Sequence, residues 1–303
     1  MNGKSIHLLE PVFMQRLDQM SIASKSRIRG TMQGKRRSSE YGSSLDFADY
    51  RLYSQGDDTR QLDWHAYGRT GKPFVKLFKD EQELQVNLWL DASQSMNFGK
   101  IEGATPLRSK WEYARQLAAA IGYISLCRYD QVSASAFTTH ITKKLKQLRG
   151  KASSQRLFEF LEGCQAEGVG DVGAVFCNSS FLPRQSGMTW LFSDFLYDQG
   201  VEEALAYLLA AKQEVVAVQI LAPDELVPKL AGELRLIDSE SGAAKEVAIS
   251  SSVLEAYQIE IQKYTSTLRT FCYERGITYV LAITNVPVED VLLKEFRRSG
   301  IIR

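Results

Sequence analysis

The chain contains 303 residues, and 44% of them are hydrophobic, which is enough to build a sizeable core. Its 37 Lys and Arg residues balance 36 Asp and Glu residues, so the overall charge predicts neither a polyanion partner nor an acidic tail. No stretch approaches the roughly 18 consecutive apolar residues of a membrane helix, and residues 1–10 do not resemble a secretion signal. We therefore expect a soluble, cytoplasmic protein whose function depends on a local site.

The cysteines are scattered along the sequence: Cys127, Cys164, Cys177 and Cys272. They form no Cys-x-x-Cys pair, and none of the three histidines is near them in sequence, so a zinc site is disfavoured. Two of them lie in helical patterns among apolar neighbours, as buried thiols do, and we expect reduced thiols rather than disulfides or redox centres.

Residues 1–83 differ in composition from the rest of the chain and predict an N-terminal extension. A short amphipathic segment at residues 8–17 is followed by a basic run that contains no acids: Lys25, Arg27, Arg29, Lys35, Arg36 and Arg37. This run predicts a solvated arm, with a nucleic-acid or phosphate-binding patch as the less favoured alternative. No aromatic residues are interleaved with the bases, which makes nucleic-acid binding the weakest functional hypothesis.

Residues 49–72 mix arginines with aspartates around a turn signal at Gly56. The carboxylates considered for a catalytic role are Asp57, Asp58 and Asp63. The nearby bases are Arg51, Arg60 and Arg69. We expect ion pairs here rather than catalysis, because a catalytic role would need a base or a metal cluster that the segment does not offer. The alternation of apolar and basic residues over 74–79 predicts a half-exposed strand.

From residue 84 onward strands and helices alternate, as in an α/β domain. The predicted strands cover residues 84–90, 132–137, 141–148, 188–192, 214–221 and 278–283. The predicted helices cover residues 111–128, 154–164, a segment before the strand at 188, residues 201–212 and 253–271, and the end of the chain to about residue 298. We therefore predict a doubly wound, mainly parallel sheet over residues 84–303, with a β-hairpin inserted at residues 230–250.

Two predicted strands of this sheet end in an aspartate. Asp91 follows the first strand and is followed by Ser93 and Ser95, and Asp194 follows the strand at 188–192. Because ligands bind at the carboxyl edge of such sheets, we expect these oxygens to converge there. They would suit Mg²⁺ or Mn²⁺ better than zinc. The alternative for Asp91-x-Ser93-x-Ser95 is a serine-rich turn whose Asp caps nearby amides.

These residues resemble the von Willebrand factor A fold and its metal-ion-dependent adhesion site. Over about residues 40 to 300 the chain resembles a narrower bacterial family, the domain of unknown function 58 family. The motifs are Arg51-x-Tyr53-x-x-Gly56-Asp57-Asp58-x-Arg60, Leu62-Asp63-Trp64, Arg69-Thr70-Gly71, Val75-Lys76, Asp91-x-Ser93-x-Ser95-Met96 and Ser109-Lys110. The resemblance implies a von Willebrand factor A-like domain and a MoxR-type AAA ATPase, or its client, as partner.

The adhesion-site pattern is incomplete in one loop. It has a threonine ligand, often within Gly-Gly-Thr-Asp, where this chain has Gly168-Val169-Gly170-Asp171. Gly170 offers no side chain, so Asp171 or water would have to replace that ligand, or metal binding would be weak or absent. The resemblance matches Asp194 to the final acid of the pattern.

We expect a non-enzymatic interaction module whose sheet edge binds an acidic residue of the partner through the metal. The chain has no Gly-x-x-x-x-Gly-Lys-[Ser/Thr] loop, so nucleotide-driven work would be done by the ATPase. The alternative is a Mg-dependent phosphohydrolase with Asp91 as nucleophile. This enzyme is disfavoured because haloacid-dehalogenase phosphatases place an acid two residues after the nucleophile, where this chain has Ser93.

Overall fold

The computed structural model describes residues 8–24, 47–54, 62–78, 83–99, 109–230, 232–237 and 242–303. The chain forms two compact units: a larger one of Met1–Ser24 and Leu84–Arg303, and a smaller one of Lys25–Glu83. The basic run at 25–37 and the acidic turn at Asp57 and Asp58 lie outside the described residues, so their predicted roles stay predictions.

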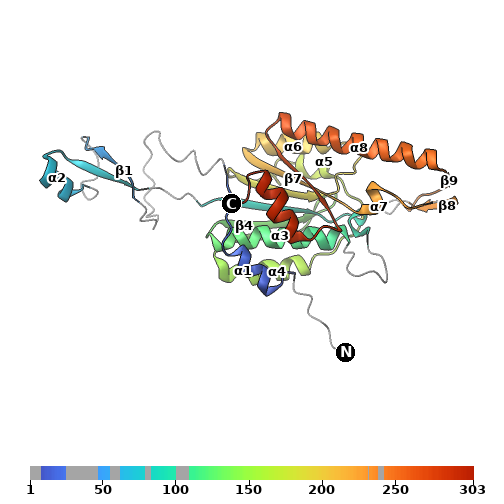
Figure 1. Ribbon diagram of the computed structural model, residues 1–303, viewed down its shortest axis with the longest axis horizontal. Helices are drawn as coiled ribbons and strands as arrows, with labels where there is room; N and C mark the ends of the chain where they lie inside the picture. Colours follow the sequence, from blue (N-terminus) through green and yellow to red (C-terminus); the bar gives the residue numbers. More distant parts are fainter. Residues whose placement is uncertain are drawn as a thin grey trace, which may run out of the picture. The chain divides into compact units, whose positions relative to one another are not determined.

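The larger unit is an α/β fold built on a six-stranded, mostly parallel sheet (Figure 1). Its strands are β3 (Gln85–Asp91), β4 (Gln131–Phe137), β5 (Ile141–Leu148), β6 (Gly187–Ser193), β7 (Gln213–Leu221) and β10 (Thr278–Ile283). Their order is β10-β7-β6-β3-β4-β5, and only β5, at one edge, runs antiparallel to its neighbour. The chain therefore extends the sheet from β3 in one direction and then returns to add β6 on the other side of β3. Such a reversal creates a crevice at the carboxyl ends of the two strands.

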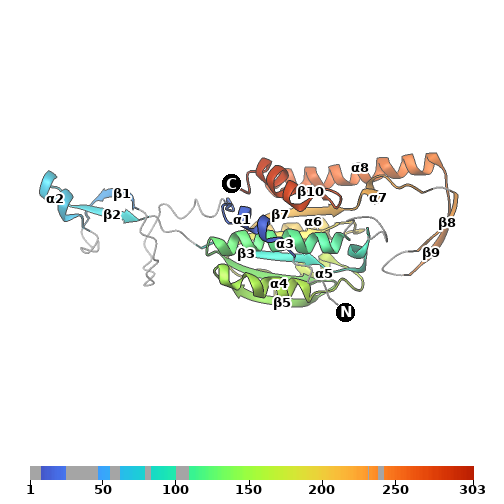
Figure 2. The same ribbon diagram turned by 60° about the horizontal axis from the view of Figure 1, so that its bottom comes forward.

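Helices cover both faces of this sheet. Successive side chains of a strand point to opposite faces, so apolar strands give each face its own core for helices to bury. Trp190 of β6 lies in one buried core with α1 (Pro11–Leu17), α3 (Lys110–Cys127), α4 (Ser154–Glu162), α9 (Val288–Asp290) and the π-helical Val291–Phe296. Leu191 lies in the other core with α5 (Val172–Phe176), α6 (Val201–Ala210) and α8 (Ser251–Glu274). Figure 2 shows α3 and α8 on opposite sides of the sheet. None of the helices among the described residues is both long and apolar enough to cross a membrane.

A β-hairpin interrupts the alternation after β7 and the short helix α7 (Pro223–Leu226). Strands β8 (Gly232–Ile237) and β9 (Ala244–Ile249) pair with each other antiparallel, with Leu234 opposite Val247. The hairpin lies beyond the start of α8, away from the central sheet (Figures 1 and 2). The structure thus contains the hairpin that the sequence predicted at 230–250.

The first described residues pack on the larger unit, although the sequence placed all of residues 1–83 in one extension. Leu17 of α1 is fully buried, and the backbones of Ser21 and Arg303 exchange two hydrogen bonds of 3.1 and 3.0 Å. The carboxylate of Asp18 accepts hydrogen bonds from Lys151, at 2.7 Å, and Tyr123, at 2.8 Å. Residues 8–24 belong to the larger unit because their apolar side chains are buried in its core.

The smaller unit contains an antiparallel strand pair with a helix between the strands. Strand β1 (Phe47–Leu52) pairs with β2 (Phe74–Phe78), and α2 (Trp64–Thr70) connects them. Asp63 caps α2 by accepting hydrogen bonds from the amides of His65 and Ala66, and it also accepts one from the Tyr50 hydroxyl at 2.9 Å. Asp63 was one of the aspartates for which the sequence predicted a structural role. It is the N-cap of α2, a position that Asp residues favour.

Candidate functional site

The crevice where the strand order reverses brings the two predicted strand-end acids together. β3 and β6 are parallel neighbours, with Leu90 opposite Phe192, so Asp91 and Asp194 come to the same edge of the sheet. Both residues are buried: Asp91 as a whole is 0% exposed and Asp194 as a whole is 2% exposed. Buried carboxylates need hydrogen bonds or opposite charges, so the partners of each acid define what this edge can do.

Asp91 is surrounded by hydroxyl groups. Its Oδ2 atom accepts hydrogen bonds from the hydroxyls of Ser193, at 2.6 Å, and Tyr197. Its Oδ1 atom accepts one from the amide of Ser93, at 3.0 Å, and the hydroxyl oxygens of Ser93 and Ser95 lie 2.9 Å apart. The Asp-x-Ser-x-Ser segment therefore forms a compact oxygen cluster, closed by two hydroxyls from β6 and the loop after it.

The burial of Asp91 changes its acidity. Desolvation and the nearby charge of Asp194 raise the pKa of Asp91 to about 6, although the hydrogen bonds that it accepts act in the opposite direction. Desolvation and the charge of Asp91 also raise the pKa of Tyr197, so its hydroxyl remains a protonated donor.

Asp194 is paired with a buried cation. The ammonium of Lys110, at the start of α3, lies 2.7 Å from Oδ2 of Asp194 and 2.5 Å from Oε1 of Glu225 in α7. The other oxygen of Asp194 accepts a hydrogen bond from the amide of Leu196 at 3.0 Å. Burial by itself lowers the pKa of Lys110, but the two carboxylates outweigh this effect and the pKa is raised, so the ammonium keeps its charge.

The loop that carries Gly170 and Asp171 contacts the Asp-x-Ser-x-Ser segment. The amide of Gln94 donates to the carbonyl of Gly168 at 2.8 Å. A Cβ atom at Gly170 would lie 2.8 Å from the Cβ of Ser93 and 2.9 Å from the Tyr197 hydroxyl oxygen, closer than such contacts allow. The Tyr197 hydroxyl thus lies where a side chain at position 170 would begin.

Asp171 has a local structural role. Its side chain accepts a hydrogen bond from the amide of Ala174 at 2.8 Å and so caps α5. The residue is exposed, in contrast to Asp91 and Asp194. The structure therefore brings four of the five predicted metal ligands to one edge of the sheet, where Asp91, Ser93 and Asp194 are buried and Ser95 is half-buried. The fifth, Asp171, caps a helix instead.

The carboxylates of the predicted divalent-cation site already have partners within the protein. Such a site needs oxygens whose lone pairs point at one common position. Asp91 already accepts three hydrogen bonds, Asp194 is paired with Lys110, and Gly170 has no side-chain oxygen.

The sequence analysis assigned no role to four members of this site: Lys110, Ser193, Tyr197 and Glu225. Lys110 belongs to the Ser109-Lys110 pair that supported the family resemblance, but no role was predicted for it. Glu225 lies shortly after the carboxyl end of β7. Residues that follow parallel strands lie at the carboxyl edge of the sheet, so the position of Glu225 after this strand was a usable signal. Tyr197 had no comparable signal beyond its closeness to Asp194 in the chain.

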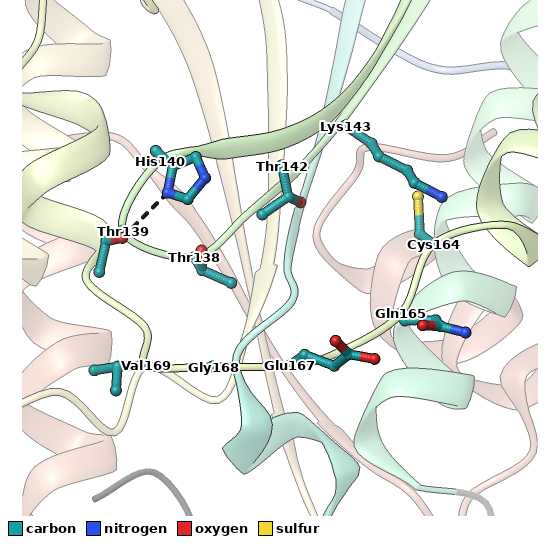
Figure 3. Close-up of a pocket in the computed structure, with 10 residues that line it drawn as sticks. All are labelled: Thr138, Thr139, His140, Thr142, Lys143, Cys164, Gln165, Glu167, Gly168 and Val169. Atoms are coloured by element: carbon teal, nitrogen blue, oxygen red, sulfur yellow. Dashed lines mark hydrogen bonds between the residues drawn. The ribbon is translucent and has the colours of Figure 1, made fainter.

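A cavity of about 480 Å³ lies next to this loop (Figure 3). Its lining residues come from the β4–β5 turn, the start of β5 and the loop before α5: Thr138, Thr139, His140, Thr142, Lys143, Cys164, Gln165, Glu167, Gly168 and Val169. Burial raises the pKa of the Cys164 thiol, which makes it a poor nucleophile. Among these side chains the hydroxyl of Thr139 lies 3.3 Å from Nδ1 of His140 (Figure 3).

The fold and the site define an α/β protein with a polar, internally paired cluster at the carboxyl edge of its sheet. The chain belongs to the family described as protein of unknown function DUF58, whose profile matches residues 49–266. The match includes the described strand pair of the smaller unit and most of the larger unit, a narrower range than the predicted residues 40 to 300.

Sequence relatives of this chain are described as uncharacterized proteins, and two solved structures resemble it weakly. Uncharacterized proteins of Mycobacterium bovis and Mycobacterium tuberculosis are each 26% identical over 251 residues, which is 82% of this chain and 77% of theirs. A crystal structure of the conserved hypothetical protein BatB from Bacteroides thetaiotaomicron is similar at 14% identity and a TM-score of 0.41, covering 72% of this chain and 98% of that one. An aerotolerance-related membrane protein from Bacteroides fragilis is similar at 17% identity and a TM-score of 0.41, covering 71% and 97%. Likenesses this weak say nothing about function.

Proposed function

We propose that the larger unit is a von Willebrand factor A-type, non-enzymatic interaction module that serves as adaptor or co-chaperone to a MoxR-type AAA ATPase. The strand order of the sheet and the position of Asp91-x-Ser93-x-Ser95 at its reversal point support this assignment. The family resemblance implies a MoxR-type ATPase, or its client, as the binding partner, so this is the partner to test.

The observation that carries the proposal is a set of exposed apolar side chains around the buried cluster. Four loops at the carboxyl edge each present one such side chain, which we call the apolar rim: Phe98 (48% exposed), Val169 (51%), Leu196 (41%) and Val227 (55%). Exposed apolar groups that gather on one face are typical of protein interaction sites.

These four loops are joined to one another through the cluster. The loop of Val169 is hydrogen-bonded to the loop that leads to Phe98, through Gln94 and Gly168. The Lys110 ammonium lies 5.8 Å from the ring centre of Phe98 and pairs with Asp194, two residues before Leu196. It also pairs with Glu225, two residues before Val227. The cluster therefore fixes the backbone from which the rim projects, and a preorganised surface loses less entropy when it binds.

The test is binding of the purified full chain to a purified MoxR-type ATPase encoded in the same genome, measured by biolayer interferometry. Val169→Asp with Leu196→Asp should weaken binding at least about tenfold, because central apolar contacts carry most of the energy of an interface. The matched control is Val12→Asp with Tyr207→Asp, which changes two exposed apolar residues on α1 and α6 and should leave Kd within about twofold. Equal effects of the two double variants, or no binding by the wild type, would contradict the proposal.

The phosphohydrolase alternative gains no support from the geometry. A nucleophile must meet its substrate, whereas the Asp91 side chain is fully buried and accepts three hydrogen bonds. Hydrolysis of p-nitrophenyl phosphate that requires Mg²⁺ and disappears in Asp91→Ala would restore it.

A further inference from the structure

We infer that the ammonium of Lys110 is the resident cation of this sheet edge, so that the edge keeps its shape without a divalent metal ion. In an Asp-x-Ser-x-Ser site a metal ion would offset the charge of buried carboxylates and join the loops that carry them. Here one ammonium joins β6, through Asp194, to α7, through Glu225.

The environment of Lys110 is that of an internal charge rather than of a surface lysine. Its side chain is 1% exposed, and its partners are 3% exposed at Asp194 and 12% exposed at Glu225. A buried ammonium without a partner would lose its proton or destabilise the fold, whereas this one has two carboxylates within 2.7 Å. It therefore remains charged inside the protein.

The backbone holds Lys110 in this position independently of the ion pairs. Ser109 caps α3, with its hydroxyl accepting from the amide of Glu112 at 3.2 Å, and the amide of Lys110 donates to the carbonyl of Phe98 at 3.0 Å. The start of α3 is thus fixed against the loop after β3. The side chain reaches the two acids from a rigid helix, as a built-in cation requires.

The presence of this ammonium opposes a second cation. A divalent ion bound to Asp194 would lie a few ångströms from a buried positive charge, and repulsion at that distance is large where water does not screen it. The neighbouring acid also has its own donors, since the hydroxyls of Ser193 and Tyr197 and the amide of Ser93 all bind Asp91. The ammonium, the hydroxyls and the amide together stabilise the two buried carboxylates, as a metal ion would.

The experiment measures metal binding by the full-length protein, without any partner, so its outcome is independent of the proposed function. Thermal unfolding and titration calorimetry are run with MgCl₂, with MnCl₂ and with EDTA. The wild type should show no saturable heat, and its Tm should change by less than about 1 °C between metal and EDTA, because a ligand that does not bind cannot stabilise.

Lys110→Met removes the ammonium and leaves the acids without their partner. This variant should be less stable in EDTA, and Mg²⁺ or Mn²⁺ should raise its Tm by about 2–4 °C, since the freed carboxylates become available as ligands. Lys110→Arg keeps the charge and should be as indifferent to metal as the wild type. If Lys110→Met does not fold while Lys110→Arg does, that result also supports a resident cation.

Two results would overturn the inference. One is saturable Mg²⁺ or Mn²⁺ binding by the wild type that is lost in Asp91→Ala. The other is a Lys110→Met protein with wild-type stability in EDTA.

Discussion

Asp91 and Asp194 have the same origin in the sequence and different environments in the fold. Each follows a buried parallel strand, and the two strands are neighbours. Asp91 is held by three neutral donors, whereas Asp194 is held by a buried ammonium and an amide. A strand-end position therefore places an acid at the carboxyl edge of the sheet. The side chains that other elements bring to it determine which hydrogen bonds and ion pairs it makes.

The difference also divides the site into two parts with different consequences for stability. The Asp194 part depends on a charge pair, which is strongly destabilising to break when it is buried. The Asp91 part depends on hydrogen bonds to a carboxylate whose pKa is raised, so its contribution should vary with pH. Variants that affect one part at a time test this division.

The largest effect should come from Lys110→Met, which leaves Asp194 and Glu225 buried without their shared cation. We expect a loss of about 3–5 kcal/mol in the free energy of unfolding, measured with urea. Lys294→Met removes an exposed lysine that pairs with Asp290 at 3.3 Å and should cost less than about 1 kcal/mol. Similar losses in the two variants would show that the buried pair has no special weight.

The next effect is a pH dependence that belongs to Asp91. Its folded pKa of about 6 exceeds its ordinary value of 3.8, so the protonated acid favours the folded state. The resulting stability is present below about pH 4 and is lost as the pH rises through about 6, with a total of at most about 3 kcal/mol. Asp91→Asn should abolish this fall, which urea unfolding at several pH values would measure against the wild type. An identical slope for both proteins would contradict the raised pKa.

A smaller effect is expected from restoring the missing loop threonine. Gly170→Thr places a Cβ within 3 Å of Ser93 and Tyr197, and we expect it to destabilise the fold by about 1–3 kcal/mol. In a Tyr197→Ala background the same substitution should cost less, because the ring has gone and part of the space is open. A double-mutant cycle by thermal unfolding gives this coupling, and strict additivity would mean that Tyr197 and position 170 do not share space.

The smallest effect on stability should come from the apolar rim. Leu196→Ser changes a side chain that is 41% exposed, and we expect the free energy of unfolding to change by less than about 0.5 kcal/mol. Urea unfolding would measure it. A decrease of more than about 1 kcal/mol in the free energy of unfolding would mean that the Leu196 side chain packs on the cluster and stabilises it.

The elements of the larger unit were predictable because their signals are local. A strand buried on both faces, such as β7, is a continuous apolar run, and α8 repeats its apolar residues at helical spacing. The predicted terminal helix is present over residues 288–298, but its middle, Val291–Phe296, is π-helical, a hydrogen-bond pattern that apolar spacing does not encode. The grouping of residues 8–24 with the larger unit was missed because it depends on contacts with the other end of the chain.

The sequence by itself determined the alternation of strands and helices, the two acids at strand ends and the glycine in place of a loop threonine. Periodicity and strand-end position are properties of neighbouring residues, so one chain is enough to read them. Only the tertiary structure decided which groups satisfy those acids. Lys110 is separated from Asp194 by 84 residues and from Glu225 by 115, and Tyr197 from Asp91 by 106. No local pattern joins residues so far apart, and their contacts give protein partners to the two acids that the sequence assigned to a metal ion.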